Sequence, residues 1–260
     1  MNITNPGLGF WLVAKEDAKR VFITGYKAGY RHFDTAFVYH NEKEIGEGIK
    51  ELNIQRDSFF LTSKIDASVK SYEKAKKAIQ ESLDNLGVEY LDLMLIHAPR
   101  PWLLMTLPFP RFNKGNREVW KALEEAKQEG KIKNIGVSNF SISDIKNIQK
   151  VAKEKIFANQ IRIHIGHVPH KVMEYCKEND ILLEAYSPIG TGRLKNKKRI
   201  KEMARKYNVS VPQLCIRYDQ QLGTIPLPRS RSENHIKENL LLDFSISDED
   251  MKILEKIKTL

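Results

Sequence analysis

The chain has 260 residues, of which 41% are hydrophobic and 29% charged, and its formal net charge at pH 7 is +10. This composition is typical of a soluble globular protein and lacks the bias that marks a disordered chain. The positive charge would suit nucleic acid or another polyanion, but no recognition motif accompanies it. The densest basic run, 195–201, contains no aromatic residues, so we interpret it as a solvated helix face and expect no nucleic-acid partner.

The start of the sequence and its two cysteines predict a compartment. Residues 1–7 lack the basic and apolar stretches of a secretory signal, and no apolar run of about 18 residues occurs in the chain. Cys176 and Cys215 fall in separate helical patterns and do not form a metal-spaced pair. We therefore expect a cytoplasmic protein with free thiols, no bound metal and no membrane partner.

Short apolar runs alternate with helical patterns along the whole chain. The helical patterns place apolar residues three or four positions apart and often end at glycine, as at Gly29, Gly87 and Gly130. The predicted helices cover 15–28, 42–52, 72–86, 119–130, 142–152, 172–176, 200–207, 212–222 and the tail that follows the capping box 247–250. The predicted strands cover 8–13, the run that ends at Asp34, 59–64, 91–96, 134–140, 157–161, 181–187 and 224–227.

This alternation predicts the fold. Eight short strands separated by helices are typical of an α/β protein with a (β/α)8 fold, the TIM barrel, whose strands are parallel. No linker, repeat or low-complexity tract divides the sequence, so we expect a single barrel domain over residues 1–260. The competing layout is an open, doubly wound sheet. That fold would usually carry a G-x-G-x-x-G turn after its first strand, which this sequence lacks.

Polar residues stand at the ends of three predicted strands, each about one strand-helix-strand unit of ~30 residues from the next. Asp34, Lys64 and His97 hold these positions, and Tyr39 follows in the loop after Asp34. The carboxyl ends of barrel strands meet on one face, where active sites of this fold lie, so we expect these four side chains to converge. Each also has a structural interpretation: a salt bridge for Asp34 and Lys64, a loop aromatic for Tyr39, and a core histidine for His97.

A phenol beside an ammonium group is suited to proton donation. A nearby positive charge favours the phenolate and lowers the pKa of tyrosine from its usual value of ~10. Tyr39 would then act as general acid, with Asp34 orienting Lys64 and with His97 binding the substrate oxygen or assisting the proton relay. Because no catalytic Ser or Cys is evident, hydride from a nicotinamide would complete the reduction of a carbonyl group.

Several segments resemble the signature segments of the aldo-keto reductases. They are 29–36 (GYRHFDTA), Tyr39 with 41–42 (NE), 62–64 (TSK), 95–97 (LIH), 136–140 (GVSNF), 159–160 (NQ), 185–188 (AYSP) and 226–230 (PLPRS). They keep one order and span nearly the whole chain, which is identified as a member of that family. The resemblance implies a catalytic tetrad of Asp34, Tyr39, Lys64 and His97, with Tyr39 as general acid.

The resemblance also implies a site for NADPH. Residues expected at the nicotinamide are Ser138, Asn139 and Gln160 at its carboxamide and Tyr186 stacked on its ring. The backbone expected beside the pyrophosphate belongs to the loop Ser187, Pro188, Ile189, Gly190 and Thr191. Residues expected at the adenosine and its 2′-phosphate are Arg229, Ser230, Arg231, His235 and Asn239. The guanidinium groups match phosphate geometry and favour NADPH over NADH.

Two departures from the family pattern concern the cofactor. Arg229 stands where the family usually has a lysine, and His235 occupies a later arginine position. The phosphate clamp is therefore expected to be looser or pH-sensitive, and use of NADH stays open beside NADPH.

Other departures concern the substrate. Residues 65–66 and Ala98 replace aromatic residues that the family commonly has, and the sequence stops at Leu260 without the lid that often follows. We expect an open pocket for an aldehyde or ketone, in a protein that is a monomer. Its apolar walls are expected from Trp11, Trp102 and Phe109, although packing alone would also explain these side chains.

Two other functions remain open at this stage. One is a barrel lyase or aldolase that forms a Schiff base at Lys64, which would require a neutral amine. An adjacent Asp34 argues against that chemistry. The other is a non-catalytic nucleotide-binding subunit or redox sensor on the same fold, which fold alone does not exclude.

Overall fold

The computed structural model describes residues 3–106 and 111–258, and its centre is one eight-stranded sheet. The strands are β1 (Leu8–Gly9), β2 (His32–Asp34), β3 (Phe60–Ile65), β4 (Leu91–Ile96), β5 (Ile132–Ser138), β6 (Ala158–Arg162), β7 (Leu182–Tyr186) and β8 (Ile225–Leu227). Every neighbouring pair from β1 to β8 is parallel and in chain order. Two backbone hydrogen bonds join the sheet edges, from Gly7 N to Pro226 O (3.1 Å) and from Gly9 N to Pro228 O (2.9 Å). The predicted (β/α)8 barrel is thereby confirmed.

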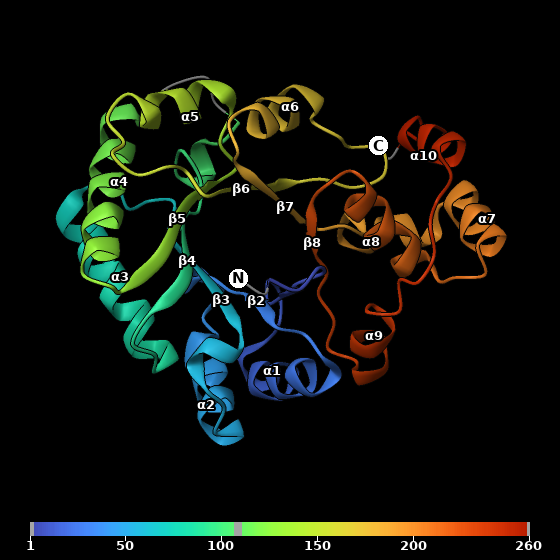
Figure 1. Ribbon diagram of the computed structural model, residues 1–260, viewed down its shortest axis with the longest axis horizontal. Helices are drawn as coiled ribbons and strands as arrows, with labels where there is room; N and C mark the ends of the chain where they lie inside the picture. The colour runs from blue at the N-terminus through green and yellow to red at the C-terminus, as the bar shows by residue number, and fades with distance from the viewer. Residues whose placement is uncertain (1–2, 107–110, 259–260) are drawn as a thin grey trace.

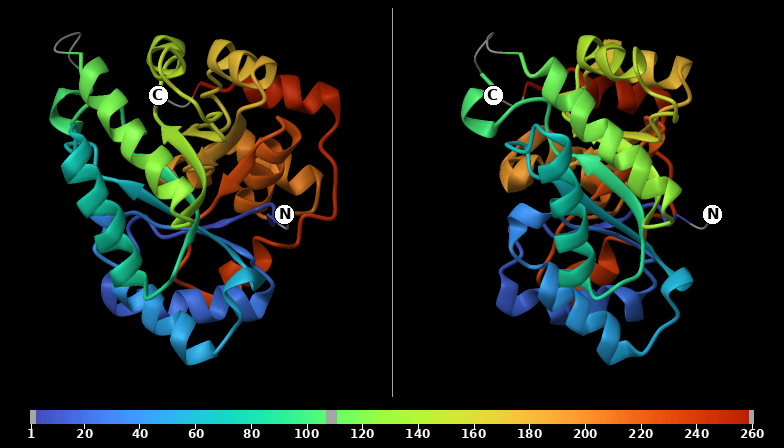
Figure 2. Two further views of the ribbon diagram at one scale, coloured as in Figure 1. Left: turned by 60° about the vertical axis from the view of Figure 1, so that its left-hand side comes forward. Right: turned by 90° about the vertical axis from the view of Figure 1, so that its left-hand side faces the viewer.

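Helices surround the strands as an outer ring (Figure 1). They are α1 (Lys15–Ala28), α2 (Glu42–Leu52), α3 (Tyr72–Leu86), α4 (Asn113–Gln128), α5 (Ile142–Gln149), α6 (His170–Glu178), α7 (Lys198–Lys206), α8 (Val211–Gln221), α9 (Glu233–Glu238) and α10 (Asp248–Glu255). The turned views in Figure 2 show α1 and α2, in blue, on one side of the strands and α6 and α10, in gold and red, on the other. Four short 3-10 turns interrupt the loops: η1 (Phe37–Tyr39), η2 (Arg56–Ser58), η3 (Trp102–Leu104) and η4 (Gly190–Asn196).

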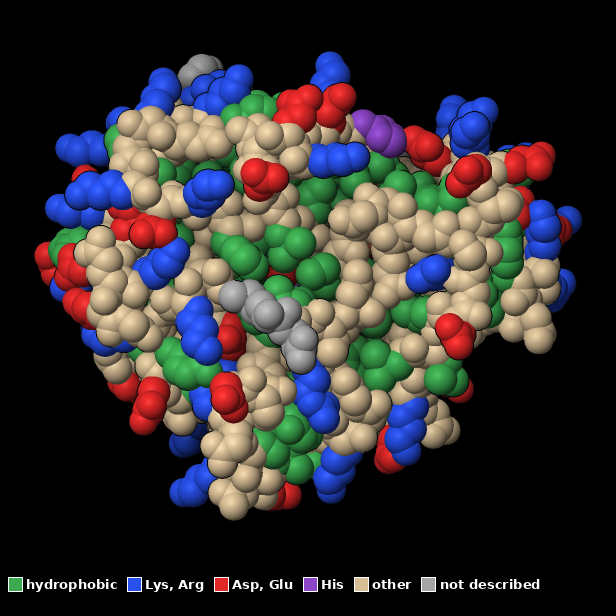
Figure 3. Space-filling view, in the orientation of Figure 1, with side chains coloured by type: hydrophobic (Ala, Val, Ile, Leu, Met, Phe, Trp, Pro, Cys, Tyr) green, Lys and Arg blue, Asp and Glu red, His purple; other side chains and the backbone are tan. Residues whose placement is uncertain are grey.

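The side chains on the surface are mixed in charge. Figure 3 shows Lys and Arg interspersed with Asp and Glu around the rim of one face, with hydrophobic side chains nearer its centre. The net charge of +10 is thus not gathered into one basic patch on this face. In the part of the chain that the structure describes, no helix has the length and apolar character needed to cross a membrane.

Several helices and strands have the bounds that the sequence predicts, and some strands end earlier than predicted for a reason that the structure shows. Helices α1, α2 and α3 and strand β4 begin and end where their apolar spacing and glycine stops predict. The first strand, predicted over 8–13, ends at Gly9 because Leu12 turns the chain with a left-handed φ of 59°. Likewise β5 and β7 stop just before Asn139 (φ 61°) and Ser187 (φ 55°). These left-handed residues lie at the carboxyl ends of strands, where uncommon backbone conformations often mark function.

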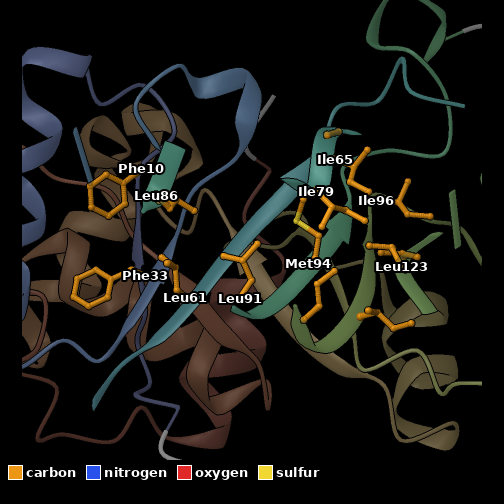
Figure 4. Packing of buried hydrophobic residues seen from close by; sticks show 14 of the residues in the cluster. Phe10, Phe33, Leu61, Ile65, Ile79, Leu86, Leu91, Met94, Ile96 and Leu123 are labelled. Carbon is orange, nitrogen blue, oxygen red and sulfur yellow. The ribbon is translucent and has the colours of Figure 1, made fainter. Parts of the chain in front are cut away.

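The hydrophobic core fills the space between the strands and the helices that cover them. Figure 4 shows part of it, with Phe33 from β2, Leu61 from β3 and Met94 from β4 beside side chains of α3 and α4. A second buried cluster lies among α7, α8 and α10. Successive side chains of a strand point to opposite faces. Phe33 and Leu61 point outward to the helices, and Asp34 on β2 and Lys64 on β3 point to the opposite face, into the barrel.

Candidate active site

The four residues of the predicted tetrad meet at the carboxyl ends of adjacent strands. Asp34 ends β2, Lys64 lies near the end of β3, and His97 follows β4 directly. Tyr39 ends η1, the turn that continues from β2. Since β2, β3 and β4 are hydrogen-bonded neighbours in one parallel register, their ends lie at the same face of the barrel.

Lys64 is the centre of this group. Its side chain has no exposed surface, and its Nζ donates hydrogen bonds to both Asp34 carboxylate oxygens, at 2.7 Å and 2.8 Å. A third bond reaches Thr35 O at 2.7 Å. The Tyr39 Oη lies 3.4 Å from Lys64 Nζ and 3.4 Å from His97 Nε2, both at the long end of hydrogen bonding. The Lys64 ammonium, the Tyr39 phenol and the His97 imidazole therefore lie in a row, with the phenol in the middle.

Burial sets the protonation of the group. Desolvation is the largest single effect and by itself lowers the pKa of Lys64, but the charge of Asp34, its hydrogen bond and the nearby Tyr39 and Glu184 together outweigh desolvation, so the net pKa is raised and the amine is charged. Burial, with a contribution from the Lys64 charge, holds the pKa of His97 well below its usual value, so that its imidazole is neutral at pH 7.

The pKa of Tyr39 differs from the sequence expectation. Burial raises it to about 12, although the Lys64 charge pulls in the predicted downward direction. The expectation of a lowered pKa is therefore wrong, because desolvation of the phenolate is the larger effect in this structure. The phenol therefore keeps its proton at neutral pH.

The predicted nicotinamide residues are bonded to one another and to the tetrad. Ser138 Oγ donates to Gln160 O at 2.8 Å, and Asn139 Nδ2 donates to His97 O at 3.1 Å. Tyr186 Oη donates to Asn139 Oδ1 at 2.7 Å. Gln160 Nε2 donates to Asp34 Oδ1 at 2.7 Å. The structure thus brings these residues into one network on β5, β6 and β7.

A cavity of about 1090 Å³ opens above the network. Of the tetrad, Asp34, Tyr39 and His97 line it, while Lys64 is buried beneath its floor. The other predicted residues that line it are Trp11, Trp102, Ser138, Asn139, Gln160, Tyr186, Ser187, Pro188, Ile189, Thr191, Arg229, Ser230, Arg231 and His235.

Apart from Lys64, two predicted residues, Gly190 and Asn239, do not line the cavity, and a third, Phe109, is not described. Gly190 turns the backbone behind it with a φ of 56°, and Asn239 is buried at the end of α9. Phe109 lies outside the described residues. Trp102 is the predicted wall residue nearest the chemistry, because its ring stands edge-on to His97 with centroids 5.0 Å apart.

The loop after β8 carries the predicted phosphate residues. Arg229 faces the cavity, and burial and the charge of Arg231 lower its pKa. Arg231 is held from outside, by Asp17 Oδ2 at 3.7 Å and by a bond from Arg20 Nη1 to its carbonyl oxygen at 3.0 Å. The two guanidinium groups are thus close enough for the charge of Arg231 to lower the pKa of Arg229.

A comparison with protein families identifies this arrangement. The model of the Aldo/keto reductase family matches residues 4–259. The chain belongs to the aldo-keto reductase family. It is 36% identical over 253 residues to glyoxal reductase of Bacillus subtilis (strain 168), which covers 96% of this chain and 87% of that protein. It is 34% identical over 275 residues to glycerol 2-dehydrogenase (NADP(+)) of Saccharomyces cerevisiae, covering 98% of this chain and 87% of that protein.

Solved structures agree. The crystal structure of MGS-M4, an aldo-keto reductase enzyme from a Medee basin deep-sea metagenome library, superposes with a TM-score of 0.90 at 34% identity. The match covers 100% of this chain and 92% of that one. An aldo/keto reductase from Brucella melitensis gives a TM-score of 0.87 at 35% identity, covering 96% of this chain and 93% of that one.

Two buried residues of this aldo-keto reductase were not predicted from the sequence. Glu184 on β7 accepts a hydrogen bond from Gln160 Nε2 at 2.9 Å, and His32 Nε2 on β2 lies 3.3 Å from its other oxygen. Burial alone raises the pKa of Glu184, but hydrogen bonds and charge from its neighbours lower it below the usual value. The sequence could have indicated both residues. His32 stands two positions before Asp34 and Glu184 two positions before Tyr186, so each side chain points to the same side of its strand as a predicted site residue.

Proposed function

We propose that this chain is an NADPH-dependent reductase of aldehydes or ketones, with Tyr39 as general acid. The observation that carries the proposal is the position of the protonated Tyr39 phenol, between the Lys64 ammonium and the neutral His97 imidazole, on the wall of the cavity. Bound NADPH would supply hydride to the carbonyl carbon. The residues of the chain supply the proton, the orientation and the charge.

Tyr39 would give its proton to the carbonyl oxygen as negative charge develops there. The phenolate that remains would be stabilised by the Lys64 ammonium, which Asp34 holds in place through two hydrogen bonds. The neutral His97 would bind the same substrate oxygen through Nε2, because that atom already faces the Tyr39 hydroxyl. Its edge-on contact with Trp102 would keep the ring in this orientation.

The donors and acceptors left in the network fit a nicotinamide carboxamide. Gln160 uses Nε2 on two carboxylates, those of Asp34 and Glu184, so its side-chain oxygen, Oε1, is left to accept from an amide N–H. Tyr186 is half-buried on the cavity wall and presents an aromatic face beside Asn139. These contacts support a nicotinamide site at this end of the cavity.

The other end of the cavity fits the adenosine. Arg229, Ser230 and Arg231 would hold the 2′-phosphate, with His235 on the same wall and Asn239 behind it. Two guanidinium groups support a preference for NADPH, while His235 in place of an arginine leaves room for NADH. The loop 187–191 would lie along the pyrophosphate, since its residues follow β7 directly.

Of the two other functions, a Schiff-base enzyme is disfavoured. Lys64 is charged, makes three hydrogen bonds and has no exposed surface, so its amine is not available as a nucleophile. A non-catalytic nucleotide-binding subunit is the second candidate, because it would need the same cofactor site without turnover. The likeness to glyoxal reductase and other named reductases favours the enzyme.

The test compares Tyr39→Phe with the control Tyr90→Phe, in which the altered hydroxyl lies just before β4 at the opposite end of the barrel. Titration of protein fluorescence with NADPH and then turnover of glyoxal and other aldehydes are measured for each. We expect Tyr39→Phe to bind NADPH like the parent but to lose roughly 10²–10⁴-fold in turnover, the range for a general acid. NADPH binding without turnover in the parent would favour the subunit, and full activity in Tyr39→Phe would remove the assigned acid.

A further inference from the structure

Arg162 occupies an unusual place at the end of β6. It is the last residue of the strand, two positions after Gln160, so both side chains leave the strand on the same side. Two residues of strand advance about 7 Å, which puts Arg162 one step above the buried amide, toward the opening of the barrel. Its backbone pairs with Tyr186 of β7, and its side chain lines the cavity.

Arg193 reaches the same wall from a different element. It lies in η4, the turn that begins within the loop 187–191, and its Nε donates to Gly190 O at 3.3 Å. This bond leaves both terminal nitrogens of the guanidinium free. Like Arg162, Arg193 lines the cavity, and the charges of both arginines contribute to lowering the pKa of the buried His164, which is lowered mainly by burial. The two guanidinium groups therefore share one neighbourhood.

Neither group has an acidic partner among residues 3–106 and 111–258. Arg56 shows how a structural arginine is satisfied in this protein: it pairs with Asp92 at 2.6 Å, donates to two carbonyl oxygens and stacks on aromatic rings. Arg162 makes no such contacts with the described part of the chain. Among the described residues that line the cavity, the one carboxylate is Asp34, and Lys64 already binds both of its oxygens.

We propose that Arg162 and Arg193 form an oxyanion site on the cavity wall, separate from the cluster at Arg229 and Arg231. Two like charges on one wall without a counter-charge are unfavourable in the free protein, and a phosphate or carboxylate group would neutralise both. Guanidinium groups bind such oxyanions through paired, charge-assisted hydrogen bonds. The anion has two sources that follow from the proposed function: the diphosphate of the dinucleotide, or an acidic substituent on the carbonyl substrate.

Inorganic diphosphate tests the site without any need for reductase activity. Its dissociation constant is measured by isothermal titration calorimetry for the parent, Arg162→Met and the double variant Arg162→Met/Arg193→Met. The control is Lys201→Met on the exposed face of α7, which removes the same charge away from the cavity. We expect each lost arginine to weaken binding about tenfold to one-hundredfold, as for hydrogen bonds to charged groups, and the control to bind like the parent.

Two further measurements distinguish the sources of the anion. If the site takes the cofactor diphosphate, Arg162→Met raises the dissociation constants of NADPH and NADH by the same factor. If it takes the substrate, those constants stay unchanged, and KM rises for 4-carboxybenzaldehyde but not for its uncharged methyl ester. Parent and variant should unfold at the same temperature.

The inference is overturned if the parent does not bind diphosphate, or if Arg162→Met binds it as tightly as the parent does. Its failure is distinct from failure of the proposed function. A parent that binds diphosphate through Arg162 but reduces neither aldehyde keeps the oxyanion site and loses the reductase assignment. A parent that reduces both aldehydes, with Arg162→Met binding diphosphate as tightly as the parent, keeps the reductase and loses the site.

Discussion

Replacing Lys64 by methionine should destabilise the barrel as well as remove activity. Methionine fills a similar volume but offers no charge, so the Asp34 carboxylate, which is 4% exposed, is left with the amide of Gln160 as its remaining hydrogen-bond donor. Removing one partner of a buried ion pair typically costs about 3–5 kcal/mol, because the other charge stays desolvated. Thr35 O also loses the hydrogen bond that it accepts from the Lys64 amine.

For a chain of this size, each kcal/mol lowers the melting temperature by roughly 2–4 °C. The change in Lys64→Met should therefore be a fall of about 6–20 °C by these two figures. Circular dichroism at 222 nm would follow thermal unfolding of the parent, Lys64→Met, Asp34→Asn and the double variant, with Lys201→Met as a control for loss of one surface charge.

The double variant decides whether the two side chains act as a pair. Removing both charges leaves no isolated ion, so its loss of stability should fall short of the sum of the single losses by about 0.5–3 kcal/mol. A Lys64→Met protein that melts within 1 °C of the parent, or single losses that simply add, would refute the assignment of a desolvated ion pair.

Three other changes test different parts of the molecule. Arg229→Ala should raise the dissociation constant of NADPH by about 10–100-fold, the range for a charge-assisted bond, and that of NADH much less; equal losses in a fluorescence titration would place the 2′-phosphate elsewhere. Burial lowers the pKa of Lys70 from 10.5 to about 8, so the unfolded chain binds more protons between these values and stability rises with pH there. The melting temperature of the parent should therefore rise relative to Lys70→Met from pH 8 to pH 10, and parallel curves would contradict the shifted amine. Gly46→Ala should destabilise α2, although alanine is favoured over glycine in helices by about 1 kcal/mol, because the new Cβ would lie 2.6 Å from Leu86 O; a higher melting temperature would show that α2 and α3 can separate.

Apolar spacing and glycine stops were sufficient to predict the bounds of several helices and strands. The apolar spacing of α3 and the glycine after it predicted both of its ends. The run 91–96, apolar except for Asp92, predicted the bounds of β4, a strand that is covered on both faces. The short β1 was overestimated, since a left-handed conformation at Leu12 is not encoded by a residue type that favours it. Helix α9 was missed because its six residues are too few to show a period.

The residues of the site could be predicted from the sequence, but the direction of the Tyr39 pKa shift could not. Spacing and strand ends located Asp34, Tyr39, Lys64 and His97, because parallel strands bring their ends together. The direction of the Tyr39 pKa shift was predicted wrongly. The sequence indicates the nearby charge of Lys64, which lowers the pKa, but not the depth of burial, which raises it and depends on how the loops close. Glu184 was not predicted because its contact with Gln160 depends on the register between β6 and β7, which places the two residues side by side and was not predicted from the sequence.

The complete burial of Lys64 has a practical side. Reagents that attack amines, such as those used to attach an enzyme to a solid support, react with the exposed lysines that cover the helices. Lys64 has no exposed surface and its Nζ is engaged by three oxygen atoms, so it should stay unmodified while the surface is coupled. Peptide mass spectrometry of the coupled protein would show whether the lysine on which the proposed chemistry depends has been left intact.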